Sequence, residues 1–128
     1  MLNLILNVLW FVFGGFAAGL AWLVGGALMA VSLIGLPWAP AVFRIALFSF
    51  APFGRSAAPT TDLGAPGRGC RDGLLNIVWF VLAGWWIALG HLIIALGQAL
   101  TIIGIPFAVQ HLKLAALALG PVGMRLKP

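Results

Sequence analysis

Charge is what this sequence has least of. Lys and Arg number 7 and Asp and Glu only 2, so charged residues make up 7% of the 128 residues, against about 25% in a typical soluble domain. Cysteine is nearly absent too, and with Cys70 alone no internal disulfide can form. Hydrophobic residues make up 63% and the mean hydropathy is +1.16. These values exclude a soluble or disulfide-stapled domain and indicate an integral membrane protein.

Four charge-poor stretches account for most of the chain, and they are residues 4–34, 38–50, 74–103 and 107–119. The first and third exceed the roughly 20 apolar residues that cross a bilayer. Inside lipid they must be helical, because no water is present to satisfy backbone N–H and C=O groups. The sequence therefore predicts an all-α integral membrane protein.

The second half of the chain repeats the first in one fixed register without a gap. Asn, Trp, Gly and Pro rarely match by chance in one register over nearly fifty positions, so a duplication is indicated. We predict a first membrane repeat at 1–54, a polar linker at 55–73, and a second repeat with a short basic tail at 74–128. The matched pairs include Leu6 and Leu75, Asn7 and Asn76, Trp10 and Trp79, Gly15 and Gly84, Pro37 and Pro106, and Pro52 and Pro121.

Each repeat has a long apolar arm followed by a proline and a shorter arm. Gly35 and Pro37 in the first repeat, and Gly104 and Pro106 in the second, predict a break in the helix, since Pro disfavours helix before it and donates no backbone bond. The short arm of about 14 residues reaches roughly 21 Å at about 1.5 Å per residue, less than a full crossing. It is a re-entrant half-helix, an interfacial helix or the end of a crossing that begins before the proline.

The sequence resembles the YccF-type inner membrane component domain of bacteria, which occurs as tandem copies of a unit of this size. The resemblance covers nearly the whole chain and is carried by residues 6–11, 14–16, 75–79, 84–86, 102–106 and 118–123. It implies a location in the bacterial cytoplasmic (inner) membrane and implies no particular reaction.

The basic residues bear on orientation. If each repeat crosses the membrane an odd number of times, the bases divide four against three between the two sides. An even number lets the linker, both chain ends and the bases of both short arms share the cytoplasmic face, as the positive-inside rule favours. We therefore expect a multi-pass protein of two helical hairpins, related by a twofold axis along the membrane normal. The alternative is an inverted repeat.

Small residues four apart predict helix packing, because they let backbones approach closely in lipid. Gly15 and Gly19 have this spacing, which Gly84 and Ala88 repeat. The apolar length makes only a small bundle, so we expect a homo-oligomer or another membrane protein as partner.

Polar residues within the apolar arms are the candidates for a pore or an interface. Asn7 and Asn76 lie on the same helix face as the tryptophan three residues on, so they are interfacial amides or line a pore or the contact between repeats. His91 and Gln98 are almost two helical turns apart, which suggests an internal hydrogen-bonded pair or a proton or ion site.

Arg44 and Lys113 are charges within the short arms. They either extend to the lipid headgroups or form a basic ring that favours anions. The bases form no dense patch for nucleic acid, and we see no catalytic set, metal motif or cofactor site.

Two functions remain open. One is a subunit of a small oligomeric channel or carrier, with ions, preferably anions, as substrate. The other is a non-transporting scaffold or an accessory subunit of another membrane complex.

Overall fold

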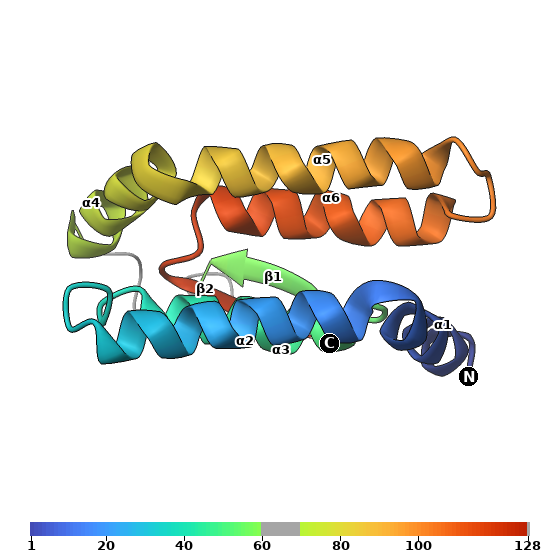
Figure 1. Ribbon diagram of the computed structural model, residues 1–128, viewed down its shortest axis with the longest axis horizontal. Coiled ribbons are helices and arrows are strands. Elements are labelled where there is room, and N and C mark those ends of the chain that lie inside the picture. Colours follow the sequence, from blue (N-terminus) through green and yellow to red (C-terminus); the bar gives the residue numbers. More distant parts are fainter. Residues whose placement is uncertain (60–69, 128) are drawn as a thin grey trace.

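The computed structural model describes residues 1–59 and 70–127, which are mostly helical (Figure 1). Each repeat forms a hairpin in which a long, kinked helix is followed by a shorter helix that packs back along it. The first hairpin consists of α1 (Leu2–Trp10), η1 (Phe11–Gly15), α2 (Phe16–Val31) and α3 (Ala39–Phe50). The second consists of α4 (Cys70–Trp79), η3 (Phe80–Gly84), α5 (Trp85–Ala99) and α6 (Ile105–Leu119).

Both long helices bend at the same place. The bends are the π-helical turns η1 and η3, which occupy equivalent positions in the two repeats. In η1 the bend includes Gly14, whose φ of 149° is one that side chains disfavour. Such turns are a recognised cause of helix kinks. The apolar length of the arms did not predict this bend.

The turn between long and short helix is built alike in both repeats. The long helices end at Val31 and Ala99, before the Gly-Leu-Pro and Gly-Ile-Pro sequences. The hydroxyl of Ser32 accepts a bond from the N–H of Gly35 at 3.0 Å, and that of Thr101 accepts one from Gly104 at the same distance. Both hydroxyls also donate to the carbonyl three residues earlier. In each turn the hydroxyl therefore satisfies one backbone N–H and one carbonyl.

A two-stranded antiparallel sheet corrects the all-α prediction. Strand β1 (Ser56–Pro59) follows the first hairpin and β2 (Met124–Lys127) follows the second. Gly54 and Gly123 turn the chain into the strands with φ of 82° and 84°. Neither four-residue segment carries a strand signal of its own, because each is stabilised by a partner far away in sequence. Residues 70–73 of the predicted linker form the start of α4, whereas residues 60–69 of that linker and Pro128 of the tail lie outside the described residues.

A pseudo-twofold axis relates the repeats, and three pairs of equivalent residues lie beside it. Ala57 is paired with Leu126 in the sheet. Ile45 and Leu114 share the buried core. The rings of Trp22 and His91 stack with centroids 6.1 Å apart and planes 5° apart. The two members of each pair occupy the same position in the two repeats, so the axis passes between them.

The twofold axis runs across the helices, whereas two hairpins standing along the membrane normal with a twofold axis along it would have their equivalent helices parallel. In Figure 1, α2 runs from right to left and α5 from left to right, with α1 and α4 at opposite ends of the molecule. The antiparallel pairing of β1 with β2 gives the reason. It places the twofold axis perpendicular to the strands, so equivalent helices point in opposite directions.

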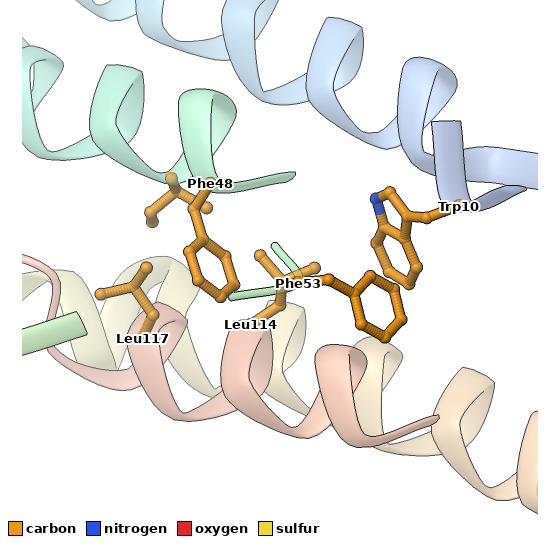
Figure 2. Packing of buried hydrophobic residues seen from close by; sticks show 6 residues of the cluster. Trp10, Phe48, Phe53, Leu114 and Leu117 are labelled. Atoms are coloured by element: carbon orange, nitrogen blue, oxygen red, sulfur yellow. The ribbon is translucent and has the colours of Figure 1, made fainter. Parts of the chain in front are cut away.

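The molecule is layered along this axis. Helix α2 packs on α3, and α5 packs on α6. Helices α3 and α6 contact each other, α3 contacts β2, and α6 contacts β1. A buried cluster joins the two hairpins under the sheet, and Figure 2 shows its residues Trp10, Phe48, Phe53, Leu114 and Leu117.

Two described helical segments are long and apolar enough to cross a membrane. They are Leu2–Val31 and Cys70–Ala99, with mean hydropathy 2.0 and 2.1. Only 17% and 22% of their most hydropathic windows are buried, whereas the core helix of a soluble protein would be mostly buried. The apolar surface of these segments therefore faces outward.

Candidate sites at the repeat clasps, the central groove and the basic cavity

In each repeat an asparagine side chain forms a clasp, by which we mean hydrogen bonds from a long-helix side chain that hold the hairpin closed. Asn7 donates from Nδ2 to the carbonyl of Phe53 at 3.0 Å, and the N–H of Phe53 donates to Asn7 Oδ1 at 2.8 Å. Asn76 makes the same two bonds with Val122, each 2.9 Å long. Both amides thus tie the start of a long helix to the turn before a strand, inside their own repeat.

The paired tryptophans make a second clasp. The ring Nε1–H of Trp10 donates to the carbonyl of Ser49, and that of Trp79 to the carbonyl of Ala118, both at 2.6 Å and buried. Glycine is needed beside them. A Cβ at Gly15 would overlap the ring of Trp10, and one at Gly84 would lie 2.8 Å from the carbonyl oxygen of Ala118. Gly15 and Gly84 therefore make room for the tryptophan of their own helix.

Gly19 and Ala88 lie where a long helix packs on its short helix. A Cβ at Gly19 would lie 2.6 Å from the ring of Phe50. Ala88, at the equivalent position, is buried against Ala115 and Ala118. These small residues lie at contacts inside each hairpin.

A groove of about 520 Å³ lies between α2 and α5. Its walls are almost entirely apolar and include Ala18, Gly25, Ile87 and Ile94. Val42 of the first hairpin and Trp79 and His111 of the second also line the groove, so both hairpins contribute to it.

His91 and His111 form a hydrogen-bonded pair at this groove. Their Nδ1 atoms are 3.0 Å apart and both residues are buried, so one imidazole donates and the other accepts. Trp22 stacks on His91, and the ring of Trp10 lies 4.9 Å from that of His111. Within the described residues no three His, Cys, Asp or Glu side chains gather as a metal site.

The predicted pair of His91 and Gln98 does not form. The side-chain oxygen of Gln98 is buried without a hydrogen-bond partner, and His91 bonds to His111 instead. His91 and Gln98 are almost two helical turns apart, which separates them by about 10 Å along the helix axis. This distance is beyond the reach of a hydrogen bond. Sequence reasoning missed His111 because it lies on another helix.

Arg44 and Lys113 lie toward the sheet layer and do not share a cavity. Arg44 lines a cavity of about 550 Å³ with Arg71, Asp72 and Arg125. Lys113 lines a smaller cavity of about 170 Å³ beside β1 and donates from Nζ to the carbonyl of Arg55 at 3.2 Å. No sequence pattern indicated that Arg71 and Arg125 would join Arg44.

These features define a class: a small, mostly helical protein of two clasped hairpins with an outward apolar surface. The family model of the inner membrane component domain YccF matches the chain twice, at residues 5–55 and 74–124. The chain belongs to this family, which confirms the resemblance drawn from its motifs.

Two curated relatives support the assignment. The chain is 36% identical over 126 residues to the inner membrane protein YccF of Escherichia coli (strain K12), covering 95% of this chain and 85% of the relative. The inner membrane protein YccF of Shigella flexneri matches to the same extent. No solved structure matches.

Proposed function

We propose that the chain is a non-conducting scaffold or accessory component of the bacterial inner membrane, with its chain ends and linker on the cytoplasmic side. The separation of charge from apolar surface supports this placement. Segments 2–31 and 73–112 contain no Lys, Arg, Asp or Glu. The described charges lie in the sheet and its flanks, in α3 and α6, or at the start of α4.

This layering favours a membrane normal along the pseudo-twofold axis. Helices α2 and α5 then lie in the hydrocarbon of the cytoplasmic leaflet, and Arg125 and Lys127, both exposed on β2, lie among the headgroups. With the helices standing across the bilayer, the sheet and its bases would lie at mid-depth, where each charge costs several kcal/mol (about 2.5 to 3.5 by insertion scales).

The hairpin tips also suit the hydrocarbon. Leu33 and Ile34 are 74% and 85% exposed, and Ile102 and Ile103 are 75% and 85% exposed. In the turn that carries them, the hydroxyl of Ser32 or Thr101 bonds one backbone N–H and one carbonyl locally. Each backbone group bonded in this way lowers the cost of placing the apolar tip in lipid.

A labelling experiment tests this placement. The native Cys70 is exposed at the start of α4, so an impermeant maleimide should modify it only after the inner membrane is disrupted. Ile34→Cys and Ile103→Cys, each with Cys70→Ser, should stay unlabelled in intact cells because the tips lie within lipid. Labelling of either tip in intact cells would show that its hairpin crosses the membrane, and labelling of Cys70 there would reverse the orientation.

The non-conducting role is carried by one observation: the polar side chains that repeat in both arms are used inside each hairpin. Asn7 and Asn76 hold backbone groups of their own repeat, and the groove between α2 and α5 is apolar around its histidine pair. An ion needs a continuous polar or hydrated lining.

Reconstitution tests this role. Proteoliposomes at a high ratio of protein to lipid should show no more chloride or potassium flux than empty vesicles, with gramicidin as the positive control for potassium. Mass measurement of the same purified protein in nanodiscs should show no closed homo-oligomer. Anion flux that falls when Arg44 and Lys113 are both changed to Gln would establish the channel function in place of the scaffold.

A further inference from the structure

We propose that the cavity between α3, α4 and β2 binds the phosphate headgroup of an anionic phospholipid. The cavity has a volume of about 550 Å³, within the usual range of roughly 300 to 1,000 Å³ for small-molecule sites. Among the described residues, Arg44, Arg71 and Arg125 line it, and Asp72 is the one carboxylate in its lining. Three guanidinium groups against one carboxylate leave an excess of two positive charges.

Toward the described part of the chain, the guanidinium groups have spare hydrogen-bonding capacity. Over residues 1–59 and 70–127, none of the three arginines forms an ion pair within 4 Å, and Nε of Arg44 is buried without a partner. A buried, unpartnered cationic donor is costly. A bound phosphate would remove that cost, because guanidinium groups bind phosphate oxygens through two parallel bonds.

The surroundings favour a lipid over a free anion. Leu33, Leu36 and Pro37 of the first hairpin tip line the same cavity, and Leu33 is 74% exposed. A headgroup held by the arginines would thus direct its acyl chains along the apolar tip. This choice of ligand rests on the membrane placement proposed above, whereas the phosphate chemistry does not.

The pseudo-symmetry supplies an internal control. At the equivalent positions of the opposite half, Lys113 replaces Arg44, Leu2 replaces Arg71, Asn3 replaces Asp72 and Ser56 replaces Arg125. Lys113 is already bonded to the carbonyl of Arg55. This equivalent set therefore has one base where the cavity has three, and only the cavity should hold the headgroup.

Lipid binding by the purified full-length protein tests the proposal. In neutral detergent, native mass spectrometry should detect phosphatidylglycerol bound in preference to phosphatidylcholine, and phosphatidylglycerol should raise the midpoint of thermal unfolding. Arg44→Gln and Arg125→Gln should each weaken this binding about tenfold, while Lys113→Gln leaves it unchanged. Arg125 is exposed on β2, so its variant tests the site even if the Arg44 variant fails to fold.

Each alternative outcome rejects the proposal. Equal losses in the Lys113 and Arg125 variants would indicate general attraction to anionic micelles. An equal thermal shift with inorganic phosphate would assign the cavity to a soluble anion. Equal binding of the two lipids would leave no headgroup site. Any of these results is independent of the labelling and flux experiments, so failure here leaves the proposed function standing.

Discussion

At the scale of single residues, the duplicated asparagine and tryptophan perform one structural task twice. Each side chain reaches from a long helix to a backbone group near the end of its short helix, where helical carbonyls lose their partners. Asn76 reaches Val122 and Trp79 reaches Ala118, as Asn7 and Trp10 do in the first repeat. Because these side chains bind backbone groups that are distant in the chain, they hold the hairpin closed.

Trp10→Phe should lower the free energy of unfolding by about 1 to 3 kcal/mol, because the carbonyl of Ser49 is left buried without its donor. Thermal or denaturant unfolding in mild detergent, followed by circular dichroism, measures this loss. Trp86→Phe is the control, since Trp86 is 61% exposed. If the two variants lose equal stability, the buried bond is not what stabilises the hairpin.

At the scale of elements, the two hairpins solve the same packing problem with different side chains. The first places Gly19 and Gly26 against the rings of Phe50 and Phe43. The second has Ala88 and Ala95 at the glycine positions, with Leu119 and Leu112 at the phenylalanine positions. In the first hairpin the smaller Gly on the long helix accompanies the larger Phe on the short helix. In the second hairpin the larger Ala accompanies the smaller Leu, as close packing requires.

Gly19→Ala should cost about 1 to 3 kcal/mol of stability, because its Cβ collides with the ring of Phe50. Adding Phe50→Leu recreates the combination found in the second hairpin and should recover part of the loss in a double-mutant cycle. Gly25→Ala is the control, because a Cβ there meets nothing within 4 Å. Additive effects of the two changes would show that these residues do not interact.

At the scale of the whole molecule, the sheet sets how the hairpins are related. Ala57 pairs with its own equivalent, Leu126, so the strands and the hairpins share one twofold axis. Trp22 and His91 meet on the same axis. Their difference in type makes the centre of the molecule asymmetric: only the second repeat contributes histidines to the groove.

Strand register predicts a specific cross-link. With Cys70→Ser, the pair Ser56→Cys and Lys127→Cys should form a disulfide in oxidised membranes, since directly paired residues have Cβ atoms about 5 Å apart. A faster-migrating band under non-reducing electrophoresis reports it. The pair Ser56→Cys and Leu126→Cys should not react, because Leu126 points to the opposite face. Cross-linking of both pairs, or of neither, would contradict this register.

The features that sequence analysis predicted are local or repeated. Membrane character follows from apolar length around Leu20 and Ile93, and family membership follows from motifs such as Asn7 to Trp10. The duplication is visible because Asn, Trp and Gly recur in one register in both halves of the chain. Each of these signals is contained in a short window or in the comparison of two windows, so no knowledge of the partner in space was needed.

Which distant segments meet depends on packing and strand pairing between elements. The pairing of Ser56 with Lys127, the bond between His91 and His111, and the gathering of Arg44 with Arg71 and Arg125 join residues from different elements. No single window encodes them, since antiparallel strand pairing and core packing choose the partner. Local apolar patterning and the duplication therefore specify two similar apolar hairpins, and the contacts between the hairpins set their opposite directions, the groove and the basic cavity.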